Sequence, residues 1–299
     1  MKKNYIIFDL IKISRVDHWP KQIFMIPGFM FFFYTTSVDI NIEIILLIFL
    51  SILCTSLIAS SNYVINEYLD ANYDKHHPLK KKRVLVFKKI KLIEILIYYI
   101  FLVTISFLIS KFFFNKYFML TLILFVIMGI IYNVKPLRCK DLRVIDILSE
   151  SINNPIRFIL AYTALGGSFD LNLYILLSYW SGGAFLMTCK RYAEKKFFKN
   201  NINLAKYRPS IAKYNFLHLL YLIFIFAILS EIFLFIFLLQ INIINPYFSL
   251  YFIFLFIFYF FFSTNKKGLA QTPEKMFFDL RFNAFLIFFF IIFYLILAP

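Results

Sequence analysis

The chain has 299 residues, of which 62% are hydrophobic, and its mean hydropathy is +0.78. Apolar runs recur along nearly its whole length, which excludes a water-soluble domain, because a soluble helix carries only one apolar stripe. The formal net charge of +16 does not indicate nucleic-acid binding, because the basic residues fall in loops between apolar segments, where membrane orientation and anionic lipid explain them.

The first predicted element is Tyr5 to Trp19, in which apolar and charged residues alternate. This pattern is typical of an interfacial helix that lies along the headgroups of a lipid bilayer. Apolar runs long enough to cross the bilayer follow it. We therefore predict an all-α polytopic membrane protein that forms one domain over residues 1–299, and a homo-oligomer is compatible with the sequence. The nine expected spans lie near residues 21–38, 43–66, 91–110, 116–133, 144–166, 171–188, 214–238, 246–263 and 281–298.

Lysine and arginine are distributed unevenly between the two sets of loops. Lys111 and Lys116 lie between the third and fourth spans and Arg157 lies inside a span, whereas all the others lie on the opposite side. Basic residues collect in cytoplasmic loops. We therefore expect a protein integral to the inner cell membrane, with its N-terminus and its even-to-odd loops in the cytoplasm.

A ladder of polar residues follows the second expected span. Asn62, Asn66, Asp70 and Asp74 recur every four residues, so a helix places them on one ridge, each roughly 6 Å above the last. Two carboxylates at that separation repel by roughly 3 kcal/mol at an effective dielectric of about 20. A cation removes this cost, and Mg²⁺ prefers such oxygen ligands. The alternative interpretation is a solvated helix end with incidental acids.

The segment Asn66-Glu67-x-x-Asp70-x-x-x-Asp74 resembles the N-D-x-x-D-x-x-x-D motif of the UbiA prenyltransferase superfamily, with Glu67 in place of the first Asp. The resemblance implies a UbiA-like helical bundle. It also implies that these four residues are catalytic and hold Mg²⁺ on a diphosphate.

The basic run that follows resembles the H-P-x-K-x-x-R sequence of polyprenyl-phosphate phosphoribosyltransferases, such as the decaprenyl-phosphate enzyme. His77, Pro78, Lys80 and Arg83 carry the match, and Val84 stands where that family usually has Pro. We expect His76 and His77 to be solvated loop residues rather than metal ligands.

Upstream, Arg15-x-x-x-Trp19-x-Lys21 resembles the R-P-x-x-W-x-K-N sequence of the same subgroup, from which Val16 and Gln22 depart. The alternative for Trp19 is an aromatic anchor at the membrane interface.

Ionisable residues also lie within the fifth expected span. Asp146, Glu150, Asn153 and Arg157 fall on one helical face, and such residues usually line a cavity or pair with one another. We expect Arg157 to pair with Glu150 or with a substrate phosphate; a buried ion pair that only joins helices is the alternative. Pro155 should kink this helix. The substrate-binding candidates of this span are Asp146, Glu150, Asn154 and Arg157.

The loop after the sixth span contains Lys190-Arg191-Tyr192-Ala193-Glu194, which matches the K-R-Y-A-E sequence of the phosphoribosyl subgroup. Aromatic prenyltransferases of the superfamily carry a second Asp-rich motif there. The segment Thr272-Pro273-Glu274, followed by Asp279 and Arg281, resembles the P-E…D-R entry to the last helix of that subgroup.

The resemblance implies Mg²⁺-dependent transfer of 5-phosphoribosyl from phosphoribosyl pyrophosphate to a polyprenyl phosphate, with release of pyrophosphate. A site that binds such a donor needs acidic residues that hold Mg²⁺ on the diphosphate and basic residues that bind the other phosphate. The alternatives are transfer of an isoprenoid from its diphosphate to an aromatic acceptor and, less favoured, transport of an anionic solute, for which no internal repeat is apparent. The remaining substrate-binding candidates are Lys21, Lys80, Arg83, Lys135, Lys140, Arg143, Lys190, Arg191, Tyr192 and Glu194.

Overall fold

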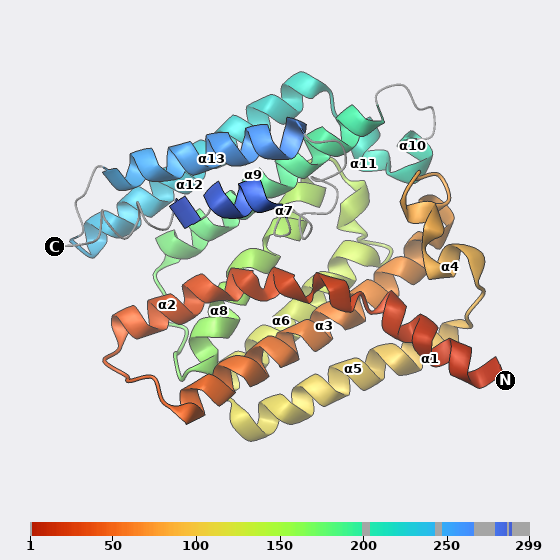
Figure 1. The fold of residues 1–299 in the computed structure, drawn as a ribbon, viewed down its shortest axis with the longest axis horizontal. Coiled ribbons are helices and arrows are strands. Elements are labelled where there is room, and N and C mark those ends of the chain that lie inside the picture. The colour runs from red at the N-terminus through yellow and green to blue at the C-terminus, as the bar shows by residue number, and fades with distance from the viewer. Residues whose placement is uncertain (1, 199–203, 243–246, 266–278, 286, 289–299) are drawn as a thin grey trace. The chain divides into compact units, whose positions relative to one another are not determined.

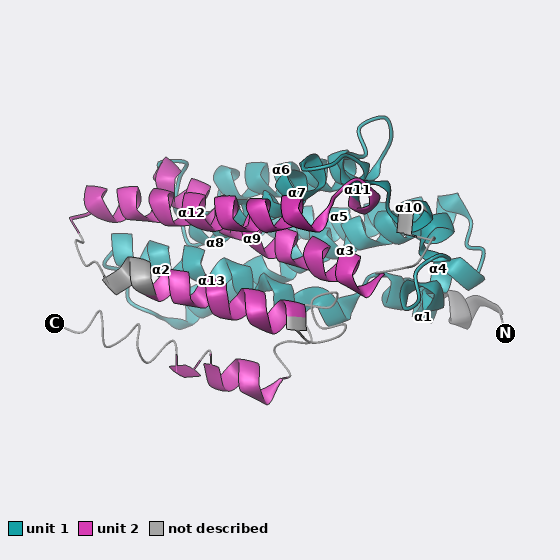
Figure 2. Ribbon diagram, turned by 90° about the horizontal axis from the view of Figure 1, so that it is seen from above, with its two compact units in different colours: residues 1–171, 202–210 teal, residues 172–201, 211–299 magenta. Residues whose placement is uncertain are grey.

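The computed structural model describes residues 2–198, 204–242, 247–265, 279–285 and 287–288, and within these ranges every regular element is a helix, as predicted (Figure 1). The chain forms two compact units, which Figure 2 distinguishes by colour. Unit 1 comprises residues 1–171 and 202–210, and unit 2 comprises residues 172–201 and 211–299. The single domain over residues 1–299 stays a prediction.

The N-terminal elements differ from the expected ones. The helix α1 (Lys2–Ile13) ends before a turn in which Arg15 is left-handed, with φ of 49°. A 3₁₀ helix, η1 (Val16–Met25), and the ten-residue α2 (Ile26–Thr35) follow. The expected span 21–38 is therefore wrong as one continuous helix. Pro27, in the first turn of α2, is one physical reason, because it has no N–H to donate to the carbonyl of Ile23 and so cannot continue an α-helix that began earlier.

The long helices of unit 1 agree well with three expected spans. They are α3 (Ile42–Asp74), α5 (Leu92–Phe113) and α6 (Lys116–Asn133). Within the described ranges, these three and α12 (Phe216–Gln240) are long and apolar enough to cross a membrane. The count of nine spans stays a prediction. Short elements connect the long helices: η2 (Lys80–Lys82), α4 (Val84–Phe87) and η3 (Cys139–Asp141).

The fifth expected span is interrupted near its proline. It forms α7 (Ile145–Ser151) and α8 (Asn153–Ala164), which meet at Ile152. Pro155 cannot donate to the carbonyl of Ser151, and its ring crowds that carbonyl. The predicted kink is confirmed as a break, and the single helical face expected over residues 146–157 is wrong because that face is divided between two helices.

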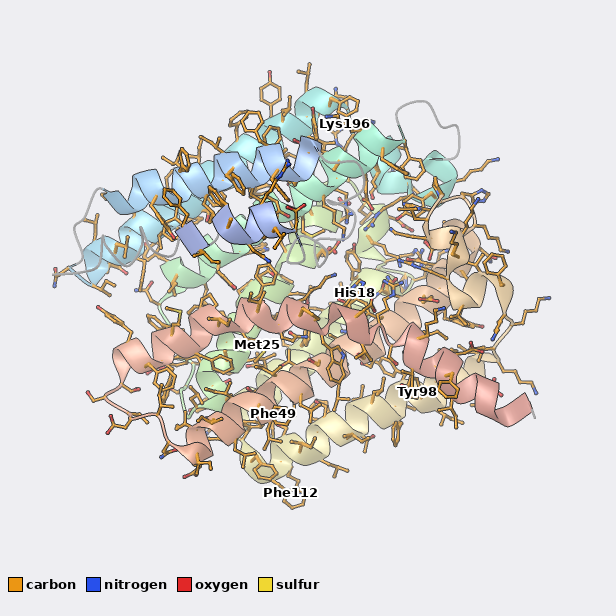
Figure 3. The ribbon with its side chains drawn as sticks, viewed as in Figure 1. His18, Met25, Phe49, Tyr98, Phe112 and Lys196 are labelled. Atoms are coloured by element: carbon orange, nitrogen blue, oxygen red, sulfur yellow. The ribbon has the colours of Figure 1, made fainter. Side chains whose placement is uncertain are left out.

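The core of unit 1 is apolar and tightly packed. The helix α3 packs against α5, α6 and α8, and α2 packs against α8. Gly28 allows the close approach of α2, since a Cβ atom there would lie 2.3 Å from the carbonyl oxygen of Phe158. Met25 is fully buried, whereas Phe49 and Phe112 project outward and are 62% and 77% exposed (Figure 3). Exposed apolar side chains of this kind suit helices that are surrounded by lipid.

Unit 2 is built on a pair of helices, α9 (Leu173–Phe197) and α12, with α13 (Tyr247–Asn265) packed against both. Ser178 and Ser230 join the pair, because each hydroxyl donates to the other residue's backbone carbonyl over 2.9 Å. Small hydroxyl residues at such a crossing let two backbones approach closely.

The helices α3 and α5 are joined by reciprocal hydrogen bonds of the same kind as those between α9 and α12. In unit 1 the Ser106 hydroxyl donates to the carbonyl of Cys54 over 3.0 Å, and the Cys54 thiol donates back to the carbonyl of Ser106 over 3.5 Å. Both linked pairs are 52 residues apart in the chain. The absence of an apparent internal repeat stays an expectation from the sequence.

Two expected features near the C-terminus lie wholly or mainly outside the described residues. They are the segment Thr272-Pro273-Glu274 and most of the span 281–298. The carboxylate of Asp279 accepts hydrogen bonds from the backbone N–H groups of Arg281, over 3.0 Å, and Phe282. Asp279 thus caps the start of a helical turn.

We expect Gly28→Ala to destabilise the protein by about 1 to 3 kcal/mol, because the added methyl group overpacks the contact between α2 and α8. The matched control is Gly182→Ala, where the new Cβ atom would meet only the Ser230 hydroxyl, at 3.2 Å. Thermal unfolding of the detergent-purified variants measures both effects. Equal midpoints for the two variants would contradict the close approach.

Candidate active site

The polar ladder lies on one helix, as predicted, at the C-terminal end of α3. Asn66 donates from its amide to the side chain of Asn133, the last residue of α6. Asn133 in turn donates to the carbonyl of Gly129 over 2.9 Å. A Cβ atom on Gly129 would overlap the Asn62 amide, so the glycine lets α6 lie against the ladder.

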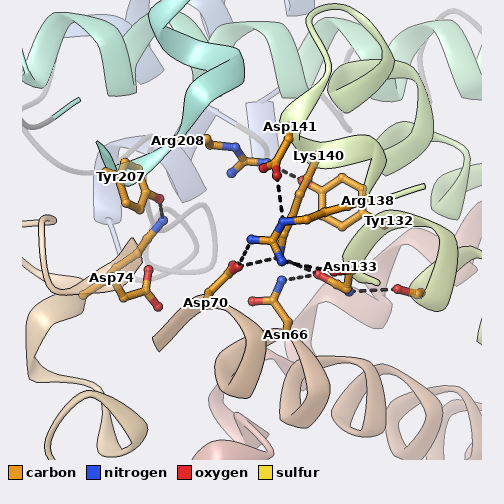
Figure 4. Close-up of polar contacts among 12 residues, drawn as sticks. Asn66, Asp70, Asp74, Tyr132, Asn133, Arg138, Lys140, Asp141, Tyr207 and Arg208 are labelled. Atoms are coloured by element: carbon orange, nitrogen blue, oxygen red, sulfur yellow. Dashed lines mark hydrogen bonds and ion pairs between the residues drawn. The ribbon is translucent and has the colours of Figure 1, made fainter. Parts of the chain in front are cut away.

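Asp70 is the centre of a group of cations (Figure 4). Its carboxylate lies 2.8 Å from the Arg138 guanidinium and 2.7 Å from the Lys140 ammonium. Both cations come from the segment after α6, and each has a second partner. Arg138 pairs with Asp141 over 2.7 Å, and Lys140 donates to the Asn133 side chain over 2.9 Å. Burial lowers the pKa of Lys140 to about 8, against the opposing effect of Asp70.

Asp74 and Glu67 each have a cation of their own. Asp74 is buried and pairs with Arg83, which comes from the basic run after α3. Glu67 is buried and pairs with Arg15 over 3.3 Å. The arginine from the N-terminal motif and the arginine from the H-P-x-K-x-x-R motif therefore meet the same acidic helix.

His77 is a structural residue of the basic loop. It is 1% exposed, and its Nδ1 accepts from the backbone N–H groups of Leu79 and Lys80 over 3.1 and 3.2 Å. The expectation of a solvated His77 is wrong, because its ring caps the start of η2 and packs edge-on against Tyr207, 4.6 Å away. Lys80 donates to the Tyr207 hydroxyl, so residues 204–207, which form α10, contact the basic loop.

The candidates on α7 contact the same segment. Glu150 accepts from the Tyr132 hydroxyl over 2.6 Å, and Arg208 donates to that hydroxyl. Asp146 is fully buried and accepts from Ser210 over 3.2 Å. The segment 204–210 is therefore tied to the loops and helices that surround the acidic ridge of unit 1. It continues into α11 (Pro209–Ala212).

Arg157 points into the core of unit 1. Its Nε donates to the side-chain oxygen of Gln22 over 3.0 Å, and its Nη1 donates to the carbonyl of Asn153 over 3.1 Å. Its guanidinium lies over the ring of Phe125. The pairing of Arg157 with Glu150 or with a phosphate stays a prediction.

The other unit 1 candidates occupy less buried positions. Lys21 bonds to His18 over 3.0 Å and lies over the Tyr63 ring. Trp19 donates from its indole to the Ser60 hydroxyl over 3.0 Å, so it anchors η1 to α3. Lys135 and Arg143 are exposed, and Asn154 is half-buried near the start of α8.

In unit 2, the K-R-Y-A-E sequence lies near the end of α9. Arg191 and Glu194 are both fully buried and form an ion pair of 2.9 Å. Tyr192 packs against Phe216 and Phe260, and Lys190 is half-buried. Substrate contact by these four residues stays a prediction.

The donor set of unit 1 fits Mg²⁺ shared with a phosphate. Among the described side chains, no group of three or more His, Cys, Asp or Glu could hold a metal by itself. Mg²⁺ does not require one, because it is usually held by one or two carboxylates, substrate phosphates and water. Asp70 and Asp74 lie one helical turn apart and supply two such carboxylates, and Asn66 lies one turn before them.

Several residues of this site were missed by the sequence analysis. They are Tyr132, Asn133, Arg138, Tyr207 and Arg208, which lie in loops or at helix ends and join segments that are distant in the chain. The sequence does contain a signal for Arg138, because it lies in the same basic loop as the candidates Lys135, Lys140 and Arg143. No local pattern marks Tyr207.

Comparisons with known proteins agree with the helical fold. The model of a family described as the UbiA prenyltransferase family matches residues 24–296. The fold is similar to that of a UbiA homologue from Archaeoglobus fulgidus, solved with GPP and Mg²⁺ and also with DMAPP and Mg²⁺. The TM-scores are 0.68 and 0.69, at 18% identity, over 94% of this chain and 97% of that one.

A structure of digeranylgeranylglyceryl phosphate synthase is also similar, with a TM-score of 0.62 and 16% identity over 94% of this chain and 97% of that one. No curated protein sequence matches the chain.

We expect Asp70→Asn to destabilise the metal-free protein by roughly 3 kcal/mol, because Arg138 and Lys140 lose their buried counter-charge. Adding Lys140→Met to that variant should recover part of the loss. Thermal unfolding of both single variants and the double variant measures the coupling. Strictly additive effects would show that the 2.7 Å pair between Asp70 and Lys140 contributes no interaction energy.

Proposed function

The chain belongs to the UbiA prenyltransferase family, and we propose that it transfers 5-phosphoribosyl from phosphoribosyl pyrophosphate to a polyprenyl phosphate. The observation that carries this proposal is the pairing of each carboxylate of the ridge with a cation from another segment. Asp70 faces Arg138 and Lys140, and Asp74 faces Arg83. A magnesium diphosphate carries both signs of charge, so it can satisfy the carboxylates and the cations together.

The donor has a diphosphate on C1 and a separate phosphate on C5, so it needs more cations than a metal diphosphate alone. Unit 1 supplies further cations in the loops around the ridge. They are Lys80, which donates to the Tyr207 hydroxyl, and Arg208, which donates to the Tyr132 hydroxyl. Arginine suits such phosphates because its planar fork donates two parallel hydrogen bonds. Lys190 and Arg191 of unit 2 are proposed as further phosphate ligands from the sequence motif.

The reaction requires no strong base in the protein. A phosphate monoester with a second pKa of about 6 is already largely a dianion at neutral pH. One of its oxygens forms a bond to C1 while the bond from C1 to the diphosphate breaks, and pyrophosphate leaves. Bound Mg²⁺ would neutralise charge on the leaving group. Arg83, Arg138 and Lys140 would orient the diphosphate and stabilise its growing charge.

The acceptor is a lipid, which explains why this chemistry occurs in a membrane protein. We propose that the polyprenyl tail lies in the bilayer and that its phosphate reaches the site from the cytoplasmic side of the inner membrane. The uneven distribution of basic residues between the loops supports this orientation.

A second candidate function is transfer of an isoprenoid from its diphosphate to an aromatic acceptor. The structures of the Archaeoglobus fulgidus homologue with GPP and DMAPP favour it. Replacing phosphoribosyl pyrophosphate by geranyl diphosphate and an aromatic acceptor tests it. Release of pyrophosphate from that pair alone would favour the prenyltransferase and contradict the phosphoribosyl donor.

We expect purified protein with Mg²⁺, phosphoribosyl pyrophosphate and polyprenyl phosphate to release pyrophosphate, and Asp70→Asn or Asp74→Asn to slow that release on the order of 10²-fold. Asp17→Asn is the matched control, because its carboxylate is 77% exposed and lies outside the ridge. Intact-mass analysis of the lipid product identifies the transferred group. Unchanged release by both ridge variants would contradict the metal site.

Lys140→Met should raise the KM for phosphoribosyl pyrophosphate by roughly tenfold, since a buried charge-assisted contact to phosphate is lost. The comparison variant is Lys75→Met, which removes an exposed lysine just after the same ridge. Steady-state kinetics at saturating polyprenyl phosphate measures both. A larger effect from Lys75→Met would argue against a role for Lys140 in donor binding.

A further inference from the structure

A buried arginine of unit 1 links the side chain of one polar residue to the backbone of another. Gln22 lies on η1, and Asn153 and Arg157 lie on α8. Gln22 is 4% exposed and Arg157 is 8% exposed. The guanidinium of Arg157 donates to the side-chain oxygen of Gln22 over 3.0 Å and to the backbone oxygen of Asn153 over 3.1 Å.

These contacts determine which way both amides point. A guanidinium only donates hydrogen bonds, so the oxygen of the Gln22 amide faces Arg157 and its NH₂ group is turned away. The NH₂ group of Asn153 donates to the carbonyl of Glu150 over 3.1 Å, which leaves its side-chain oxygen as the remaining acceptor. Both remaining atoms, Gln22 Nε2 and Asn153 Oδ1, are buried and have no hydrogen-bond partner within the described part of the chain.

Buried polar atoms are nearly always hydrogen-bonded, and an unsatisfied one needs a specific explanation, such as a bound ligand. Here one donor belongs to a residue whose side chain Arg157 contacts, and one acceptor belongs to a residue whose backbone Arg157 contacts. A hydroxyl group matches them, because it both accepts and donates. A phosphate dianion would satisfy only the donor, and an apolar isoprenoid chain would satisfy neither.

The position of these residues relative to the acidic ridge suits a substrate that spans both. η1 and α8 both pack against α3, and Trp19, one 3₁₀ turn before Gln22, bonds to Ser60 of that helix. Ser60 precedes Asp70, the nearer of the two ridge aspartates, by ten residues, which is a rise of about 15 Å along an α-helix. The Gln22 and Asp70 side chains and a metal ion bound to the diphosphate would shorten the distance that the donor has to span.

We infer that Gln22 and Asn153, oriented by Arg157, form a hydroxyl-binding subsite for the ribose of the donor. The inference rests on the proposed function and adds a means of selecting the donor. An isoprenyl diphosphate has no hydroxyl, so it would leave both buried atoms unpaired. Sites built to bind a substrate hydroxyl discriminate strongly against analogues that lack it.

The test measures dissociation constants, with Mg²⁺ present, for phosphoribosyl pyrophosphate and its 2-deoxy and 3-deoxy analogues. We expect the unsubstituted full-length protein to bind one of the two deoxy analogues at least about tenfold more weakly than the parent donor. Gln22→Leu and Asn153→Leu should weaken binding of the parent donor and remove its advantage over that analogue. Ser106→Ala is the control, because it removes an equally buried hydrogen bond at the α3 and α5 contact and should keep the preference.

The outcomes separate the subsite from the proposed function. Equal affinities of the unsubstituted protein for all three ligands would overturn the subsite, and this comparison needs no variant to fold. A preference that survives in both Gln22→Leu and Asn153→Leu would also overturn it. If the unsubstituted protein shows no Mg²⁺-dependent binding of the parent donor, the proposed function itself fails.

Discussion

The pairing of buried carboxylates with cations from distant segments is the constraint on which the polar end of unit 1 depends. Glu67, Asp70 and Asp74 are brought together by one helix, where they would repel one another without counter-charges. Arg15, Arg138 and Arg83 supply those charges from three different segments. These ion pairs therefore hold the loops around α3 in place, and under the proposed function the same residues would bind the magnesium diphosphate.

The two linked helix pairs give the K-R-Y-A-E sequence a structural context. If the linked residues Ser178 and Cys54 are aligned, Glu194 takes the position of Asp70. In the same alignment Lys190 takes the position of Asn66. One pair thus carries the acidic ridge, and the other carries Lys190 and the buried pair of Arg191 with Glu194. The two helix pairs therefore carry different charged residues at corresponding positions.

Sequence reasoning recovered the parts of the site that lie on continuous helices or within short motifs. The four-residue spacing of Asn66, Asp70 and Asp74 is a local property of an α-helix, so it could be predicted. The partner of each carboxylate could not, because Arg138 and Arg208 reach the site through loop conformations that depend on long-range contacts. Gln22 departs from the motif in the sequence, and its hydrogen bond with Arg157 follows from the packing of α8 against η1.

The sequence by itself determined the membrane class, most of the long helices, the acidic ridge and the family. Each of these follows from composition, helical period or short motifs, which act over one or two turns of chain. Only the tertiary structure decided the break at Ile152, the burial of His77, the contacts of residues 204–210 and the contact of Arg157 with Gln22. These features depend on which segments meet in space, and hydrophobic packing sets those meetings without leaving a periodic signal in the residues concerned.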